Sequence, residues 1–182
     1  MSDELLDIVD DNDKPTGITK MKSLAHGDGS WHRCAHVWIY NSKSEVLLQF
    51  RSHDKLLYPD KWDVSAAGHI GAGEDVLTGA QREIEEEIGI KVKKQDLYFF
   101  KKLKVPIHYH GMINNEFYYI YLYKYNGSIN NLKLQIEEVA AIKLMPVDKV
   151  KKEFIKDPNK FTPNKDYWFS VLDKIQELNS RK

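Results

Sequence analysis

The feature that most constrains this chain is a glycine-rich loop followed by an acidic helix, within residues 68–90. Four glutamates fall within five positions, at Glu83, Glu85, Glu86 and Glu87. A helix has about 3.6 residues per turn, so three of them share one side and Glu85 points elsewhere. Like charges at that spacing repel, whereas a hard divalent cation such as Mg2+ or Mn2+ selects carboxylate oxygens. The spacing favours a metal-binding helix over the alternative of a solvated acidic helix.

The residues around these glutamates predict how the helix begins, ends and packs. Glu74 and Asp75 begin it, where negative charge suits the helix dipole, and Gly89 ends it. Three glycines precede it and predict a tightly bent loop; they are Gly68, Gly71 and Gly73. The apolar positions share an adjoining face that is expected to press on a sheet; they are Val76, Leu77, Ala80, Ile84 and Ile88.

The same stretch resembles the Nudix box, G-x5-E-x7-R-E-U-x-E-E-x-G-U, in which U is an aliphatic residue. It matches at every specified position: Gly68, Glu74, Arg82, Glu83, Ile84, Glu86, Glu87, Gly89 and Ile90. The resemblance implies a loop–helix–loop site that binds divalent metal and hydrolyses a diphosphate linked to another group. The metal ligands that it implies are Glu83, Glu86, Glu87 and the Gly68 carbonyl. It also implies that Glu74 and Arg82 brace the loop and orient the carboxylates.

The order of predicted elements is compatible with the fold that this resemblance implies, an α/β/α sandwich with a mixed central sheet and an N-terminal β-hairpin. Residues 4–20 read as the hairpin, and residues 21–34 as a loop that contains His26 and His32. His108 and His110 are expected in a second loop. Further strands are expected at 35–41, 45–52, 64–68, 97–104, 116–125 and 140–146, and further helices at 147–155 and 164–178. We expect a single domain over residues 1–182.

Composition excludes several classes of function. Lys plus Arg equals Asp plus Glu at 27 each, so no global basic field favours nucleic acid. No apolar run approaches the length that spans a membrane, and the acidic start lacks the pattern of a signal peptide. The single cysteine, Cys34, fits a reducing cytoplasm and is expected to be a small buried thiol. The expected partner is a small-molecule diphosphate, and a homodimer is left open.

A second resemblance covers the region from His26 to Ile70. The segments WHRCAHVWIYN, LLQFRS and YPDKWDVSAAGH are similar to those of type 1 isopentenyl-diphosphate isomerases, which share the Nudix fold. The resemblance implies a further metal set of His26, His32, His69 and Glu116, with Asn114 where another Glu is expected. The isomerases carry a catalytic cysteine where this chain has Ala67, and alanine can neither donate nor accept a proton. Ordinary loop anchoring is the competing interpretation for His26 and His32.

The residues therefore favour a Nudix hydrolase that uses Mg2+ or Mn2+ to activate water against an organic diphosphate, such as a nucleoside diphosphate derivative. Arg51 and Lys55 are candidate phosphate ligands, with a surface salt bridge as the competing interpretation. The general base stays open among a box glutamate, Glu116, Glu137 and Glu138. An isomerase-like enzyme and a non-catalytic diphosphate-binding module are the two alternatives. The substrate stays open among a nucleoside diphosphate derivative, an isoprenoid diphosphate and a thiamine-type diphosphate.

Overall fold

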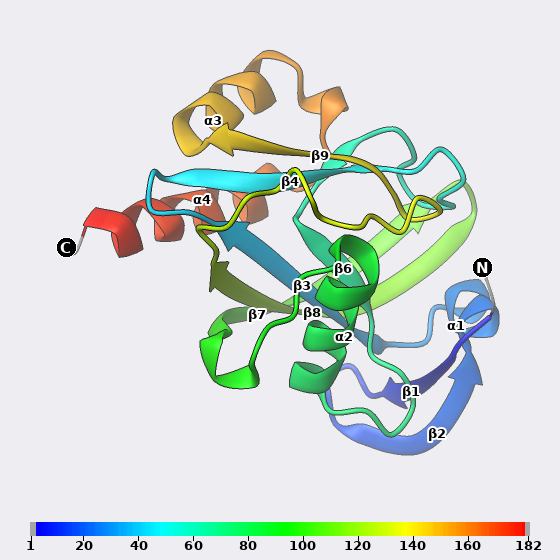
Figure 1. Cartoon of the computed structure of the whole chain (residues 1–182). Helices are drawn as coiled ribbons and strands as arrows, with labels where there is room; N and C mark the ends of the chain where they lie inside the picture. The colour runs from blue at the N-terminus through cyan, green and yellow to red at the C-terminus, as the bar shows by residue number, and fades with distance from the viewer. Residues whose placement is uncertain (1–2, 181–182) are drawn as a thin grey trace. The chain divides into compact units, whose positions relative to one another are not determined.

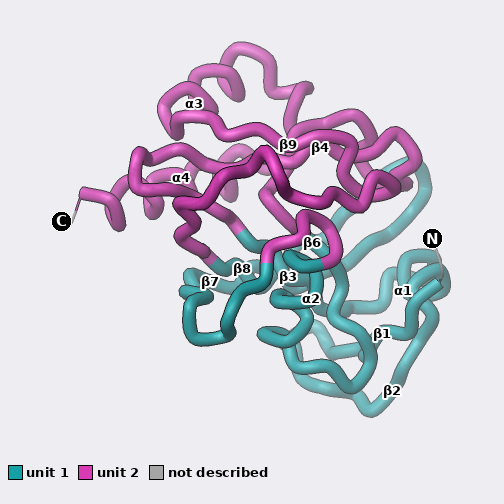
Figure 2. The backbone as a smooth tube through the Cα atoms, viewed as in Figure 1, with its two compact units in different colours: residues 1–37, 67–85, 91–121 teal, residues 38–66, 86–90, 122–182 magenta. Residues whose placement is uncertain are grey.

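The computed structural model describes residues 3–180 and divides them into two compact units (Figures 1 and 2). Within the described residues, the first unit comprises 3–37, 67–85 and 91–121, and the second comprises 38–66, 86–90 and 122–180. Strands β3, β6 and β8 and helix α2 each contribute residues to both units. The expectation of one domain over residues 1–182 stays a prediction.

The N-terminal hairpin that the sequence predicts forms part of the first unit. Strand β1 (Leu5–Val9) pairs with strand β2 (Pro15–Met21) in an antiparallel two-stranded sheet. The second strand begins at Pro15, so residues 10–14 form the turn between the strands. Alternate residues of β1 face inward, and Leu6 and Ile8 form a buried cluster with Ala25.

The loop expected at residues 21–34 is wrong, because this segment contains a helix and the start of a strand. Helix α1 (Lys22–Asp28) begins after Met21, and the carboxylate of Asp3 accepts hydrogen bonds from the backbone NH and hydroxyl of Ser23. It ends at Gly29, whose φ of 73° is readily adopted by glycine. Seven residues show too little periodicity to indicate a helix. Stabilising contacts to this helix come from Asp3 and Glu4, outside its own span.

The other elements of the first unit are strands and the box helix. Strand β3 (His32–Tyr40) begins at His32, and strand β6 (Ala66–His69) leads into the box loop. Helix α2 (Val76–Ile88) follows, and then the 3-10 turn η1 (Lys94–Asp96). Strands β7 (Tyr98–Tyr109) and β8 (Met112–Lys124) are longer than predicted. His108 therefore lies in β7 rather than in a loop, and His110 lies in the turn that follows β7, with a φ of 47°.

The second unit is built on three strands and two helices. Strand β4 (Glu45–Arg51) pairs antiparallel with β5 (Trp62–Asp63) and with β9 (Val139–Pro146). Helix α3 (Val147–Lys156), the 3-10 turn η2 (Pro158–Lys160) and helix α4 (Lys165–Ser180) complete it. Its aromatic core includes Trp38, whose indole NH donates to the Tyr167 hydroxyl at 2.7 Å and whose ring meets Trp168 edge-on.

The predicted fold class is confirmed: the chain is α/β, with a mixed sheet, helices and an N-terminal antiparallel hairpin. The strand order in the larger sheet is β5-β4-β3-β8-β7, and β6 pairs with β3 while β9 pairs with β4. No helix among residues 3–180 is long and apolar enough to cross a membrane.

Candidate functional site

The box helix begins at Val76, so Glu74 and Asp75 lie before it rather than in its first turn as expected. Asp75 caps its first turn, because Oδ1 accepts hydrogen bonds from the backbone NH groups of Leu77 and Thr78 at 3.1 and 3.0 Å. Gly89 follows its last residue with a φ of 73°. Ala80, Ile84 and Ile88 are fully buried. Helix α2 is thereby fixed at both ends and along its apolar face, which sets the direction of its glutamates.

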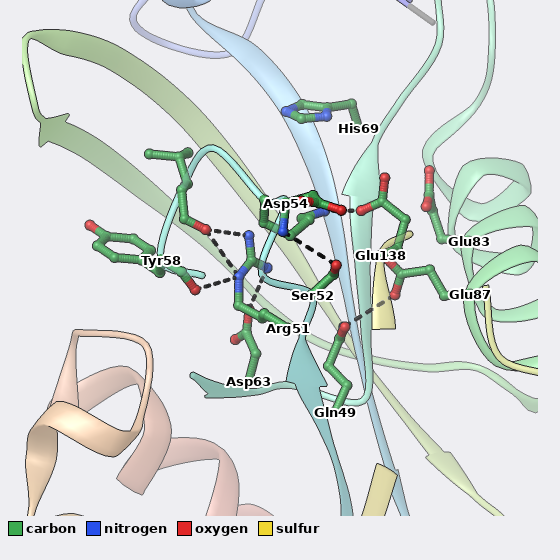
Figure 3. A network of polar contacts seen from close by, with 12 residues as sticks. Gln49, Arg51, Ser52, Asp54, Tyr58, Asp63, His69, Glu83, Glu87 and Glu138 are labelled. Carbon is green, nitrogen blue, oxygen red and sulfur yellow. Dashed lines mark hydrogen bonds and ion pairs between the residues drawn. The ribbon is translucent and has the colours of Figure 1, made fainter. Parts of the chain in front are cut away.

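Two of the three candidate metal-binding glutamates are withdrawn from water. Glu83 is 8% exposed and Glu87 is 3% exposed, whereas Glu86 is exposed. A buried carboxylate is stable only if hydrogen bonds or cations compensate its charge. Glu87 accepts a hydrogen bond from the Gln49 side-chain amide at 3.1 Å (Figure 3). The alternative of a fully solvated acidic helix therefore does not describe α2.

Arg82 connects Glu83 to the loop that precedes the helix. Its guanidinium donates to both carboxylate oxygens of Glu74, at 3.1 and 3.0 Å. It also donates to Glu83 Oε1 at 2.6 Å and to the His69 backbone oxygen at 2.9 Å. Glu74 in turn accepts from the Gly71 backbone NH at 3.1 Å. These are the contacts that the predicted brace requires.

Gly68 lies directly against Glu83. A Cβ at position 68 would be 2.0 to 2.3 Å from the three atoms of the Glu83 carboxyl group, a separation that real Cβ atoms essentially never show. Only glycine therefore leaves room for this carboxylate. The contact places the backbone of β6 beside Glu83. The Gly68 carbonyl and Glu83 must be close to each other if they are to bind the same metal ion.

The two predicted phosphate ligands lie in the second unit, and both have protein partners. Arg51 donates to the backbone oxygens of Leu57 and Tyr58, at distances from 2.7 to 3.1 Å, and to Asp63 at 2.9 Å (Figure 3). Arg51 thus holds the loop after β4 to β5, which is the arrangement of the competing salt-bridge interpretation. Its role in phosphate binding stays a prediction.

Lys55 forms an ion pair with Glu138. Both side chains are largely buried, at 17% and 14% exposure, so the pair is less screened by solvent than a surface ion pair. The pairing joins a predicted phosphate ligand to a predicted general base. Glu137, the neighbouring candidate base, is exposed.

A second group of candidate ligands lies entirely in the first unit, and we call it the His–Glu cluster. It consists of His26 from α1, His32 from β3, His69 from β6 and Glu116 from β8, and one ligand atom from each lies within 4.8 Å of all the others. The three imidazole rings have centroids 5.1 to 5.2 Å apart. The structure thus brings together all four residues of the further metal set.

The donor atoms of the cluster suit a metal ion. Within residues 3–180, the buried Nε2 atoms of His26, His32 and His69 have no aligned hydrogen-bond partner. Two of them nevertheless lie near Glu116 Oε1, at 3.1 Å for His69 and 3.6 Å for His32. Buried nitrogen lone pairs without hydrogen bonds are costly. Three imidazoles and one carboxylate are ligands that Zn2+ and other transition-metal ions accept.

The charge states of these groups follow from burial and from their neighbours. Burial, with the two other histidines, lowers the pKa of His26 to about 4, so this ring is neutral near pH 7. Burial would raise the pKa of Glu116, but the adjacent His32 and His69 hold it well below its usual value. Burial would lower the pKa of His69, but Glu116 and Glu4 raise it. The cluster therefore holds an ionised carboxylate among imidazoles.

Asn114 and Ala67 mark the departures from the isomerase pattern. Asn114 lies two residues before Glu116 on β8 and shares its face, and both polar atoms of its buried side chain lack a partner in the described part of the chain. Ala67 shares one face of β6 with His69, while Gly68 faces the other way, toward Glu83. No acid–base group occupies the position of the isomerase cysteine.

Several residues that the sequence did not single out contact the predicted site residues, and three of them contact the candidate metal ligands. They are Glu4, 3.1 Å from His69 Nδ1; Ser30, whose carbonyl is 2.9 Å from His32 Nδ1; and Gln49, which donates to Glu87. No spacing in the sequence connects them to their partners, because each contact depends on tertiary structure. The Cys34 side chain is buried, as expected.

Comparisons with known proteins show the family and the fold of the chain. The model of the NUDIX domain matches residues 30–165. The chain is 38% identical over 168 residues to Nudix hydrolase 3 of Arabidopsis thaliana, covering 90% of this chain but 22% of that protein. It is 28% identical over 166 residues to an isopentenyl-diphosphate Delta-isomerase of Pectobacterium atrosepticum, covering 90% and 86%. The crystal structure of DR0079 from Deinococcus radiodurans, at 15% identity, covers 96% of this chain and 98% of its own with a TM-score of 0.68.

Proposed function

The chain belongs to the NUDIX domain family, and from that premise we propose that it is a hydrolase that uses Mg2+ or Mn2+ to cleave an organic diphosphate. Its substrate class would be a small molecule in which a diphosphate is linked to another moiety, such as a nucleoside diphosphate derivative. The Arabidopsis relative bears the name of a Nudix hydrolase, but the chain spans only 22% of its length. The reaction and the substrate are therefore argued from the residues of this chain.

The observation that carries the proposal is the placement of Glu83. Its buried carboxylate is seated on the Cα of Gly68 and is oriented by Arg82, which Glu74 holds in turn. Glu86 and Glu87 follow three and four positions later on the same helix, so the three carboxylates share one arc of it. An arc of carboxylates with one member held this rigidly supports a site for hard divalent cations.

In the proposed mechanism, Glu83, Glu86 and Glu87 would hold the metal, and the Gly68 carbonyl would be a further ligand. A divalent ion supplies charge neutralisation for the diphosphate and acidification of a bound water. Arg82 would orient the Glu83 carboxylate through its 2.6 Å hydrogen bond. The proton of the attacking water would pass to a carboxylate, for which a box glutamate, Glu116, Glu137 and Glu138 stay candidates.

Lys55 and Arg51 would contact the phosphates. Lys55 forms an ion pair with Glu138. On substrate binding its ammonium group would exchange one anionic partner, the carboxylate, for another, a phosphate. Arg51 would bind substrate only by giving up contacts with the loop that it now holds. Lys55 is for this reason the stronger of the two candidates.

A second metal centre is proposed at the His–Glu cluster. The buried Nε2 atoms and the ionised Glu116 carboxylate support it, and the ligand set of three imidazoles and one carboxylate favours a softer ion than Mg2+. The same cluster favours one further candidate function, an isomerase-like proton transfer on an isoprenoid diphosphate, as the name of the Pectobacterium relative suggests. Ala67 opposes it, because isomerisation needs two positioned acid–base groups.

A substrate screen tests the proposal. Nucleoside diphosphate derivatives, isoprenoid diphosphates and thiamine-type diphosphates are incubated with the protein and Mg2+ or Mn2+, and the products are identified. We expect one class to release phosphate or a phosphorylated fragment only when metal is present. Metal-independent release, or binding of every class without turnover, would contradict the proposal and favour a diphosphate-binding module.

A further inference from the structure

The carboxylate of Glu4 contacts a histidine of the His–Glu cluster at the ring nitrogen that faces away from the proposed metal. Glu4 Oε1 lies 3.1 Å from Nδ1 of His69, and Nε2 of the same ring lies 3.1 Å from Oε1 of Glu116. The imidazole of His69 is thus placed between two carboxylates, one at each nitrogen. Glu4 precedes the first strand and belongs to no motif in the sequence.

Contacts with α1 and the box loop fix Glu4 in this position. Lys22 Nζ lies 2.9 Å from the same Oε1 atom, and the Lys22 backbone NH donates to the Glu4 carbonyl at 2.8 Å. The next residue, Leu5, accepts a hydrogen bond from the Ala72 backbone NH at 2.8 Å. Lys22 therefore holds the Glu4 carboxylate, and the two backbone hydrogen bonds hold the main chain at residues 4 and 5.

From this geometry we infer that Glu4 is a positioning residue of the second metal centre. An acceptor at Nδ1 places the ring proton there, which leaves the Nε2 lone pair for a metal ion. A carboxylate also makes the imidazole a stronger ligand than a neutral acceptor does. This inference rests on the proposed function, because it assigns a role toward the metal proposed at the His–Glu cluster.

His32 shows the same arrangement with a weaker acceptor. Its Nδ1 lies 2.9 Å from the backbone carbonyl of Ser30, so its Nε2 also faces the cluster. A backbone carbonyl cannot be altered by substitution and carries no net charge. Glu4, unlike the Ser30 carbonyl, is a side chain, so substitution can remove its charge and keep a hydrogen-bond acceptor.

The test is metal affinity, measured by Zn2+ competition and by the visible absorption of bound Co2+. His32→Ala identifies the signal that belongs to the cluster, because that signal is lost. Glu4→Gln keeps the size and an acceptor oxygen but removes the charge, and we expect about 10- to 100-fold weaker binding. The matched control is Asp3→Asn, which weakens the tether of the same segment to Ser23 without touching His69. We expect its metal affinity to change by less than about threefold.

A spectroscopic measurement separates positioning from general stability. In the zinc-loaded wild-type protein, the Nδ1 proton of His69 should give a downfield resonance that is slow to exchange with water. In Glu4→Gln this resonance should move upfield, while the melting temperature of the metal-free protein stays close to that of Asp3→Asn.

Three results would overturn the inference. Unchanged metal affinity in Glu4→Gln would show that the carboxylate does not tune the site, and equal losses in Glu4→Gln and Asp3→Asn would assign the effect to the tether. If the wild-type protein shows no metal binding that is lost in His32→Ala, the second metal centre and the role of Glu4 are both refuted. None of these measurements involves diphosphate hydrolysis, so failure of the hydrolase proposal is recognised separately by the substrate screen.

Discussion

The carboxyl carbon of Glu83 occupies the space beside Gly68, 2.0 Å from the point at which a Cβ at position 68 would lie. Gly68→Ala must therefore displace either the carboxylate or β6. We expect folded protein with turnover lowered by about 10²-fold, because a shift of about 1 Å at a catalytic centre has that effect. Steady-state kinetics on the substrate found in the screen measures it.

Gly71→Ala is the matched control for that variant. It lies in the same loop, but its added Cβ would meet only Glu74 Oε2, at an ordinary contact distance of 3.6 Å. Turnover close to wild type is expected. Equal losses in the two variants would mean that the loop is sensitive to any added side chain and that the Glu83 contact has no special role.

Glu87→Gln tests the metal site on the helix. Gln retains the size and a group for Gln49 to contact, but it removes a charged metal ligand. The rate should fall by about 10²-fold or more, with weaker Mn2+ binding. Glu85→Gln makes the same chemical change at an exposed residue that pairs only loosely, at 3.3 Å, with Lys91, and it should retain activity. Near-wild-type turnover in Glu87→Gln would refute the site assignment.

Arg82→Ala removes four hydrogen bonds at once, to Glu74, Glu83 and the His69 carbonyl. Because the side chain is 31% exposed, we expect a moderate loss of about 1 to 3 kcal/mol in the free energy of unfolding. Metal affinity should fall with it. Denaturant melts and Mn2+ titration test this, and a change confined to KM would reassign Arg82 as a phosphate ligand.

The last prediction separates hydrolase from isomerase. Incubation with isopentenyl diphosphate in deuterated water should give no isomer and no deuterium in the recovered substrate, because Ala67 cannot exchange a proton. Mass spectrometry checks both. Deuterium incorporation that survives Cys34→Ala and disappears in Glu116→Gln would establish isomerase-like chemistry. Ala67→Cys is a companion variant that restores the missing thiol.

The sequence predicted the parts of the site whose spacing is local. Glu83, Glu86 and Glu87 lie on one helix, so their common arc follows from the helical period, and Asp75 and Gly89 delimit that helix as expected. Only the resemblance to isomerases predicted the His–Glu cluster, because its members come from four separate elements. No periodicity connects residues 26, 32, 69 and 116.

What the sequence could not predict depends on tertiary contacts. Helix α1 was missed because a contact with Asp3 stabilises its short span. The engagement of Arg51 with Leu57 and Tyr58 could not be distinguished from phosphate binding, since an arginine at a strand end suits both. The partner of Glu87, Gln49, lies 38 positions away on another element. A homodimer and a cytoplasmic location stay predictions.

The alternation of side chains along β6 has a consequence for how such enzymes diverge. Ala67 and His69 project from one face of a four-residue strand, and Gly68 adjoins Glu83 on the other. A mutation at position 67 would add or remove an acid–base side chain on one face of the strand. It would leave the contact between Gly68 and the Glu83 carboxylate, on the opposite face, unchanged. Positions 67 and 68 could thus be selected independently. An enzyme lineage could change between hydrolysis and isomerisation without changing the glutamates of the Nudix box.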